Sequence, residues 1–391
     1  MICKLGDIAD LITKGTTPKK YIDNPNTDSI IFLRAENIDG TIIGDESFKY
    51  IDATTHEKEL KRSILQENDI LITIAGSLGR TAKITNKHLP ANTNQAVAIV
   101  RITKKDVDID YVLYYLRRPL FMQNAIAASA QSVQPNLNLQ QIADLEIELP
   151  SFEEQQKIAK TLRSFDNLIE HNSLIIRKLN NLLWNFYKKM ISTQSAVELK
   201  EGWKLVKLGQ VTSNNREKVG SKKPPVFSAL NTGILIPSTE HFTKQVFSKD
   251  ISKYIIVKHH DFAYNPARIN IGSLGINDYE YEGCVSPVYV AFSVDKEYIN
   301  FFRYYLKSDP FKEEVKSRAS GSVRQTLNYS DFALIELPYP PVSIIKTFNE
   351  QYNLYMSSIN QLKSNNEKII KLRDLVLSKL FAGDFDLSKL S

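Results

Sequence analysis

The sequence predicts an α+β protein, in which two similar globular domains with β-rich cores are joined by two long antiparallel coiled-coil helices. Two observations lead to this fold class: an internal repeat divides the chain, and each copy ends in a long segment with an apolar period of about 3.5 residues. Along the 391 residues we expect a first domain at 1–150, a first helix at 151–192, a linker at 193–203, a second domain at 204–338, and a second helix with a C-terminal tail at 339–391.

The repeat consists of short matches that occur in the same order in both halves, separated by about 190 to 200 residues. KLGDIAD at Lys4–Asp10 matches KLGQVTS at Lys207–Ser213, and GSLG occurs at both Gly76–Gly79 and Gly272–Gly275. The other matches pair NQAVAIV with SPVYVAF, YVLYYLRRP with FRYYLKSDP, SVQPNLN with SVRQTLN, and EIELP with LIELP. One tetrapeptide match would arise by chance, but an ordered series indicates a duplication.

Each domain contains short apolar runs bounded by turn residues, which is typical of strands. The predicted strands are Ser29–Leu33, Ile70–Ile74, Ala96–Ile102, Tyr254–Val257 and Pro287–Phe292. One helix is predicted at Asp110–Leu116. Strands with an occasional helix favour a largely β core in each domain.

The first long helix is predicted to begin after Pro150, with Ser151 as its cap and Glu154 in an acidic first turn. Apolar residues then recur in alternating steps of four and three at Ile158, Leu162, Phe165, Ile169, Ile176, Leu179, Leu183, Phe186 and Met190. The second helix repeats the pattern at Phe348, Tyr352, Tyr355, Ile359, Leu362 and Ile369, and less regularly at Val376 and Leu380. Arg373 interrupts this second seam, and Gly383 provides a stop.

A seam of this length needs a partner, and we expect the two helices to pair with each other. A duplicated chain closes most simply about a pseudo-two-fold axis, which makes the helices antiparallel and gives a dumbbell with a domain at each end. Asn172 and Asn366 would then face each other and fix the register, whereas the alternative is that both are solvated. A further alternative is that each helix packs on its own domain. The predicted pairing residues are Ile158, Leu162, Phe165, Ile169, Asn172, Ile176, Leu179, Leu183, Tyr355, Ile359, Leu362, Asn366 and Ile369.

Composition and motifs exclude several classes of protein. The net charge is only +6, which excludes a histone-like polycation, and the two cysteines exclude a disulfide scaffold or a multi-Cys zinc site. Neither a signal peptide nor a membrane span is recognisable, so a cytoplasmic location without membrane association is expected. A phosphate-binding loop and a nucleophile elbow are missing, and Asn265-Pro-Ala-Arg268 is only superficially like a methyltransferase motif. We therefore predict no catalytic residues, no metal site and no cofactor in this chain.

Polar and basic residues cluster instead in loops at equivalent places in the two copies. Arg, Asn, Gln and Ser/Thr can read base edges, while Lys and the amides of Gly-rich loops hold phosphates. In the first domain the predicted DNA-binding residues are Lys14, Thr16, Lys19, Lys20, Arg34, Asn37, Ser77, Arg80, Asn92, Asn94, Gln131, Ser132 and Asn136. In the second they are Arg216, Lys218, Lys222, Lys223, Asn265, Arg268, Asn270, Ser273, Arg318, Ser322, Arg324 and Gln325. The plainer interpretation is that these loops are polar because loops generally are.

The sequence resembles the specificity (S) subunits of Type I restriction-modification systems over essentially its whole length. The segments that carry the resemblance are KLGDIADLITKGTTP, NDILITIAGSLGR, LPSFEEQQKIAKTLRSFDNLI and KIIKLRDLVLSKLFAGDF. The most specific pattern is LP-x-x-EEQ-x-x-IA at Leu149–Ala159. The second copy departs from it, because Tyr339–Ser343 has lost the Glu-Glu-Gln.

The resemblance implies that each domain is a target recognition domain for one half of a bipartite, asymmetric double-stranded DNA target. It also implies that the helices dock two modification (methyltransferase) subunits, which bind S-adenosylmethionine, and that restriction (endonuclease/translocase) subunits join them. Two alternatives stay open from the sequence: the recognition subunit of a related system that cleaves on both sides of its site, and a coiled-coil adaptor with protein-binding end domains.

Overall fold

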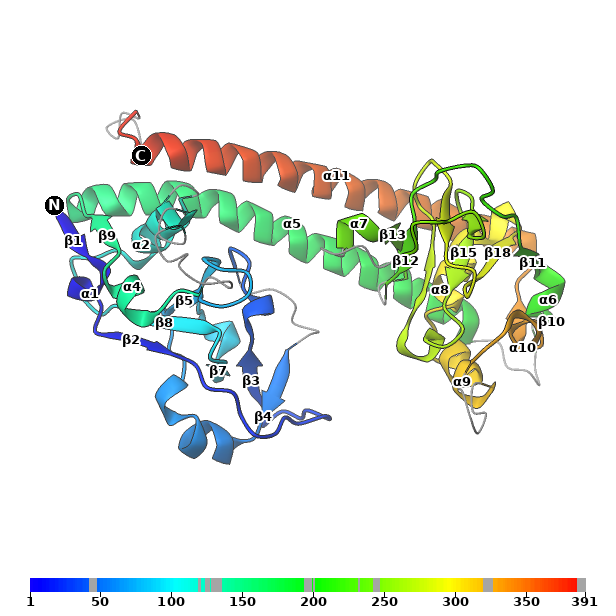
Figure 1. Cartoon of the computed structure of the whole chain (residues 1–391), viewed down its shortest axis with the longest axis horizontal. Coiled ribbons are helices and arrows are strands. Elements are labelled where there is room, and N and C mark those ends of the chain that lie inside the picture. The colour runs from blue at the N-terminus through cyan, green and yellow to red at the C-terminus, as the bar shows by residue number, and fades with distance from the viewer. Residues whose placement is uncertain are drawn as a thin grey trace. The chain divides into compact units, whose positions relative to one another are not determined.

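The structure, a computed structural model, describes residues 1–41, 48–118, 121–123, 127, 136–192, 199, 201–230, 233–241, 247–318 and 326–384. The chain divides into two compact units. Unit 1 comprises Met1–Asn172 and Ser364–Ser391, and unit 2 comprises Ser173–Lys363. Each unit therefore contains one β-rich segment together with one part of each long helix (Figure 1).

Among its described residues, unit 1 is built from nine short strands, three short α-helices, the first part of one long helix and the last part of the other. They are β1 (Ile2–Lys4), α1 (Leu5–Ile8), β2 (Leu11–Lys14), β3 (Ile30–Leu33), β4 (Lys49–Ile51), β5 (Ile70–Thr73), β6 (Thr81–Lys83), β7 (Ala91–Thr93), β8 (Val97–Arg101), α2 (Ile109–Leu116), α4 (Leu139–Ala143), β9 (Glu146–Glu148) and α5 (Phe152–Ser192). The main sheet is antiparallel with the order β2-β8-β5-β6. A second sheet has the order β4-β3-β7, in which β3 and β7 are parallel, and β1 pairs with β9.

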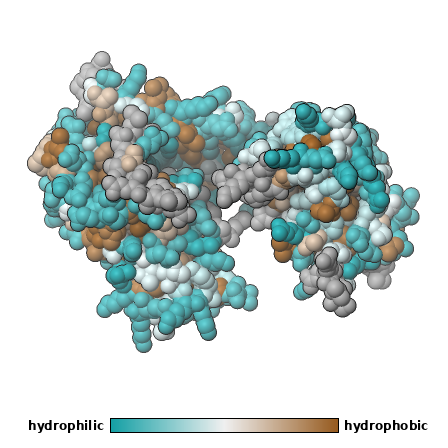
Figure 2. All heavy atoms as spheres, viewed as in Figure 1, coloured by the Kyte–Doolittle hydropathy of each residue, from teal (hydrophilic) through white to brown (hydrophobic). Residues whose placement is uncertain are grey.

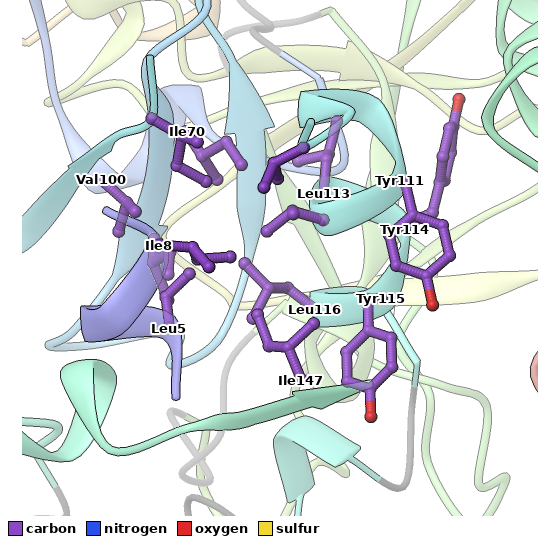
Figure 3. Packing of buried hydrophobic residues seen from close by; sticks show 14 of the residues in the cluster. Leu5, Ile8, Ile70, Val100, Tyr111, Leu113, Tyr114, Tyr115, Leu116 and Ile147 are labelled. Atoms are coloured by element: carbon purple, nitrogen blue, oxygen red, sulfur yellow. The ribbon is translucent and has the colours of Figure 1, made fainter. Parts of the chain in front are cut away.

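The core of unit 1 follows from strand alternation, because successive side chains point to opposite faces of a sheet. Ile70 and Ile72 pack on one face of β5 with Leu113 and Leu116 of α2 (Figure 3). Leu71 points to the other face and packs in a separate cluster that includes residues of β3 and β7. Because both faces of β5 are covered, its sequence ILIT is apolar at successive positions instead of alternating.

Unit 2 repeats this plan. Its elements are β10 (Lys204–Lys207), α6 (Leu208–Val211), β11 (Thr212–Asn215), β12 (Phe227–Ala229), β13 (Leu235–Pro237), α7 (Ser238–His241), β14 (Ile255–Val257), β15 (Phe262–Tyr264), β16 (Leu274–Ile276), β17 (Gly283–Val285), β18 (Val290–Val294), α8 (Ile299–Tyr305), α9 (Asp309–Arg318), α10 (Tyr329–Phe332), β19 (Glu336–Tyr339) and α11 (Val342–Phe381). The sheet β11-β18-β15-β16 has the same order of equivalent strands as β2-β8-β5-β6, and β10 pairs with β19 as β1 does with β9. The predicted strands and the predicted helix are present, within a few residues of their expected ends.

Fine details of the backbone also recur in the two units. Asn68 and His260, which both precede an aspartate and the central strand of the sheet, adopt positive φ angles of 71° and 69°. A Cβ at Gly6 would lie 3.2 Å from the Cβ of Ala143, and one at Gly209 would lie 2.8 Å from that of Ala333. The same close approach of two backbones therefore requires glycine in both copies. These features support the duplication more strongly than the sequence matches do.

The GSLG match is the exception, because its two copies are not structurally equivalent. Ile72 of β5 pairs with Thr81, so Gly76–Gly79 lies entirely in the loop before β6. Tyr264 of β15 pairs with Leu274, so the second copy already enters β16 at Leu274. Gly79 is therefore equivalent to Gly272, with φ angles of 78° and 88°, and the tetrapeptides are three residues out of register.

In unit 1 the first part of α5 lies antiparallel to the last part of α11. Asn172 Nδ2 donates to Asn366 Oδ1 at 2.8 Å, and Arg373 Nη1 lies 2.7 Å from Asp166 Oδ1. The expected Asn–Asn hydrogen bond is thus present. Arg373 continues the contact between the helices, where the sequence indicated an interruption.

The ends of both helices follow their sequence signals. Ser151 and Glu154 form a capping box at the start of α5, with Ser151 N donating to the Glu154 carboxylate at 3.0 Å. Hydrogen bonds from the Ser151 hydroxyl and from Ser151 N hold the pKa of the Glu154 carboxyl below its usual value. At the C-terminal end of α11, Gly383 has a φ of 76° and Asp384 N donates to Lys379 O, as in a Schellman motif.

In unit 2 the last part of α5 packs with the first part of α11 through Tyr187, Ile345 and Phe348. The predicted seam residue Phe186 is 37% exposed, whereas Tyr187 is 2% exposed. The seam therefore widens at this end, because Phe186 stacks on Phe348 of α11 while Tyr187 packs against the aromatic residues of α8. All thirteen predicted pairing residues are buried or half-buried.

Candidate nucleic-acid interface

Four polar segments of unit 1 meet at one end of its main sheet. The last residues of β2 and β5 and the first residues of β8 lie at the same end of the sheet, because Lys14 pairs with Ala98 and Thr73 pairs with Val97. The segments 14–20, 74–80, 94–96 and 136–138, which include these strand ends, adjoin them or bond to them, form what we call the first loop edge. The sequence placed predicted DNA-binding residues in all four segments.

Backbone hydrogen bonds fix these segments to one another. Gly15 N donates to Val97 O at 3.0 Å, Ile74 N donates to Ala96 O at 2.8 Å, and Leu137 N donates to Ile74 O at 3.2 Å. A side chain at Gly15 would overlap the carbonyl oxygens of Thr93 and Asn94, so the close approach depends on glycine. The loop edge is thus held by the sheet instead of being a set of independent loops.

The side chains on the first loop edge are mostly exposed. Lys14, Lys19, Lys20, Ser77, Arg80 and Asn136 are exposed, and Thr16 and Asn94 are half-buried. Arg80 Nε lies 3.8 Å from Asp39 Oδ1, a loose ion pair that leaves most of its donors available. Six exposed polar side chains, four of them positively charged, suit a polyanion.

Arg62 joins this edge although the sequence did not indicate it. Its Nη2 donates to Thr16 Oγ1 at 3.2 Å, which brings its guanidinium beside the Gly15–Lys20 segment. The chain reaches this position through a short 3-10 turn, Lys61–Ser63, that lies far from Thr16 in the sequence. The pair of basic residues Lys61 and Arg62 was the available signal, and it was not part of any repeat match.

Two predicted DNA-binding asparagines are structural residues instead. Asn37 and Asn92 have no exposed surface. Asn37 Oδ1 accepts from Arg34 N at 2.9 Å, and Asn92 Nδ2 donates to Leu60 O at 3.1 Å. Their amides satisfy buried backbone groups, so the prediction that they contact DNA was wrong. Arg34 is half-buried and forms an ion pair with Glu36, so its guanidinium group already has a partner within unit 1.

Unit 2 forms an equivalent second loop edge from the segments 265–273, 286–289 and 326–328. Asn265 N donates to Ser273 O at 2.9 Å, and Leu327 N donates to Pro266 O at 3.1 Å, as Leu137 does to Ile74 in unit 1. Arg268 and Asn270 are exposed on the 265–273 segment. Asn265 Oδ1 accepts from Ala267 N at 3.0 Å, so this side chain shapes the loop. Ser273 is half-buried in the same loop.

Other predicted residues of unit 2 have partners within the protein. Lys222 lies 3.1 Å from Glu282 and 3.6 Å from Glu217, and the hydrogen bond to Glu282 raises the pKa of its ammonium group. Arg318 forms an ion pair with Glu314 at 2.9 Å. The backbone of Lys218 forms a β-bridge with Ile255 of β14, but its side chain is exposed, as are those of Arg216 and Lys223. The charge on the second loop edge therefore depends most on Arg268.

Five predicted residues lie outside the described parts of the chain. They are Gln131, Ser132, Ser322, Arg324 and Gln325. Within the described residues, no group of three or more His, Cys, Asp or Glu side chains is arranged to hold a metal ion. No helix of the described residues is long and apolar enough to cross a membrane.

Comparisons with known proteins give a consistent result. Residues 1–181 match the family model of the Type I restriction modification DNA specificity domain. A Methanocaldococcus jannaschii protein, provisionally named the type I restriction enzyme MjaX specificity subunit, is 25% identical over 97% of this chain and 92% of its own length. The MjaIX specificity subunit of the same organism is 26% identical over 85% of this chain and 81% of its own length. The crystal structure of an S subunit from M. genitalium covers 97% of this chain and 95% of its own, with a TM-score of 0.49 and 18% identity.

Proposed function

This chain belongs to the specificity subunits of type I restriction-modification systems, and we propose that each of its units reads one half of a bipartite DNA target. As a specificity subunit, it recognises the DNA target of such a system. The observation that carries the proposal is the pair of equivalent loop edges, each fixed by the strand ends of its own unit. The first presents Ser77 and Arg80, whereas the second presents Arg268 and Asn270, so the two half-sites are expected to differ.

The proposal assigns catalysis to other subunits. Methyl transfer would take place on the modification subunits, which would bind S-adenosylmethionine, and cleavage on restriction subunits. The assembled complex would act in the cytoplasm. On this view the present chain supplies sequence recognition and a platform for assembly.

Exposed leucines on the long helices support the docking of two modification subunits. Leu168, Leu372 and Leu375 of unit 1 are 54%, 50% and 54% exposed. In unit 2, Leu182 and Leu354 are 51% and 59% exposed. Such residues on a helix that already has a buried seam favour a second contact with a partner. Since each unit presents its own set, we propose one modification subunit for each.

The docking proposal is tested by replacing Leu168 and Leu372 with Asn in the full chain. We expect a complex that retains one modification subunit instead of two, as measured by native mass spectrometry. Replacing Asn167 and Lys371, exposed neighbours on the same helices, with Ser provides the matched control. Retention of both subunits by the leucine variant would contradict the proposed surface.

DNA binding itself is tested by measuring affinity for duplex DNA against salt concentration. A reader that contacts six to ten phosphates should lose roughly 10³- to 10⁵-fold in affinity between about 50 and 200 mM salt. Fluorescence anisotropy with a labelled duplex, using the chain alone and with its modification subunits, gives this slope. A protein adaptor would show no such dependence, and that result would reject the proposal.

A further inference from the structure

A cavity lined by several arginines opens beside the first loop edge. It has a volume of about 320 Å³ and lies between the Leu78–Thr81 segment, the end of α2 and the last turns of α11, all within unit 1. Four guanidinium groups line it, those of Arg80, Arg117, Arg118 and Arg373. Asp39 and Asp374 line the same cavity.

Two of these arginines are neutralised inside the protein. Arg117 Nη1 lies 2.9 Å from Asp166 Oδ2, and its other nitrogens donate to Thr81 Oγ1 and Gly40 O. Arg373 bonds to Asp166 at 2.7 Å and to Asp374 at 2.9 Å. These groups build the wall and floor of the cavity. Their charges and most of their N–H donors are already used within the protein, so they leave few donors for a ligand.

Arg118 differs from them, because no carboxylate of the described residues forms an ion pair with it. Its guanidinium carbon lies 3.6 Å from the ring centre of Tyr115 and about 5 Å from those of Phe121 and Phe381. Its Nε donates to Tyr115 O at 3.2 Å, which leaves the two terminal nitrogens. The group is thus a charged fork held flat by aromatic rings, and this geometry suits an oxyanion with two oxygens in one plane.

The equivalent cavity of unit 2 shows that this charge is not required by the fold. That cavity, of about 500 Å³, is lined by the Ile269–Gly272 loop, by Leu306 and Lys307 directly after α8, and by α9. Its lining is largely apolar, with Leu306, Phe311 and Val315 among its residues, and Lys307 and Lys312 as its cations. Tyr-Tyr-Leu precedes Arg117 and also precedes Lys307, so the two cavities use the same helix end with different side chains.

We propose that Arg118 and Arg80 bind a phosphoryl group in the unit 1 cavity, and that this group is a backbone phosphate of the DNA strand that crosses the first loop edge. The inference rests on the proposed DNA-reading function and adds a phosphate clamp to it. A cavity of about 320 Å³ admits a phosphate with part of its sugar but excludes a base pair. The clamp positions the DNA and carries no sequence information.

The test compares Arg118→Gln with the wild type in the full chain. We expect the variant to bind duplex DNA about tenfold more weakly, with the magnitude of the log–log salt slope reduced by about 0.9, the contribution of one phosphate. Its preference among DNA sequences should not change. Arg118→Lys keeps the charge without the planar fork and should retain the slope while losing part of the affinity. Near-ultraviolet circular dichroism of each variant checks that the aromatic rings around residue 118 stay packed.

Lys371→Gln is the matched control, since it removes one positive charge from an exposed site on α11 of the same unit. An equal effect of Lys371→Gln and Arg118→Gln would overturn the clamp, because general electrostatics would then explain both. A ³¹P NMR titration with inorganic phosphate separates the sources of the ligand. Arg118-dependent binding of free phosphate with unchanged DNA affinity would overturn the DNA assignment. Absence of salt-dependent DNA binding by the wild type would instead reject the proposed function.

Discussion

At the scale of single residues, one carboxylate joins three elements of unit 1. Asp166 of α5 accepts hydrogen bonds from Tyr114 and Arg117, at the end of α2, and from Arg373 of α11. Burial raises the pKa of the Asp166 carboxyl, but the two guanidinium groups and the Tyr114 hydroxyl outweigh it and hold the pKa below its usual value. Arg117 in turn bonds to Thr81 and Gly40, next to the first loop edge.

We predict that Asp166→Asn destabilises the chain by about 3 kcal/mol, because two half-buried guanidinium groups lose their shared anion. The lowered pKa also sets the pH dependence. Stability from this carboxylate is present above its unfolded pKa near 3.8 and is lost as the pH falls through the lower folded value. Urea unfolding at pH 7 and pH 3 measures both effects. A variant whose loss of stability is equal at the two pH values would contradict the assignment.

The buried asparagine of β7 gives a second residue-scale prediction. Asn92→Ala removes the hydrogen bond from Asn92 Nδ2 to Leu60 O and the one between Asn92 Oδ1 and His56 Nδ1, at a site with no exposed surface, so we expect a loss of about 1–3 kcal/mol of unfolding free energy. The affinity of the folded protein for DNA should be unchanged. Asn136→Ala, at an exposed position of the first loop edge, should change stability by less than about 0.5 kcal/mol. A variant of Asn92 with full stability and weakened DNA binding would restore the sequence-based prediction.

These residues show which part of the candidate site the sequence can predict. Lys14, Ser77 and Arg80 were predicted and are exposed at the first loop edge, because the repeat marks the loops and the loops adjoin strand ends. Asn37 and Asn92 are the same residue type as the exposed Asn136, so the sequence alone does not separate them. Only the fold reveals that the partner of Asn92 is a carbonyl oxygen at Leu60. Arg62 was missed for the converse reason, since its partner Thr16 comes from a distant segment.

At the scale of elements, the long helices were the best predicted parts of the chain. Their period, the capping box at Ser151 and the stop at Gly383 are local signals, and each corresponds to an observed feature. The burial of Tyr187 beside the seam residue Phe186 was not predictable, because it depends on packing against α8. The GSLG match misled for a similar reason, since an identical tetrapeptide can take a different register when the preceding loop differs in length.

The Asn172–Asn366 pair gives the element-scale prediction. Replacing both residues with Leu should raise the melting temperature, because two apolar side chains replace a polar pair in the seam. The register of the helices should become less well defined. Calorimetry measures the first effect, and the distance between spin labels on α5 and α11 measures the second. A lowered melting temperature, or an equally narrow distance distribution, would count against a register role.

At the scale of the whole molecule, the duplication places one loop edge in each unit and lets the two diverge. The strand order and the tight Gly–Ala contacts are retained, whereas the exposed side chains and the adjoining cavities differ. A shared scaffold with divergent loops is what two different half-sites require. It also explains why a net charge of +6 says little about DNA binding, since several cations predicted to face DNA are paired within the units.

The most direct test of this account is selection of duplexes from a randomised DNA pool by the wild type, by Arg80→Ala and by Arg268→Ala. The wild type should select two short motifs separated by an unspecified spacer. Each variant should lose sequence information in one motif only, by about 1–3 kcal/mol if the arginine contacts a guanine bidentately. A single contiguous motif, or an equal loss in both motifs from either substitution, would contradict the account.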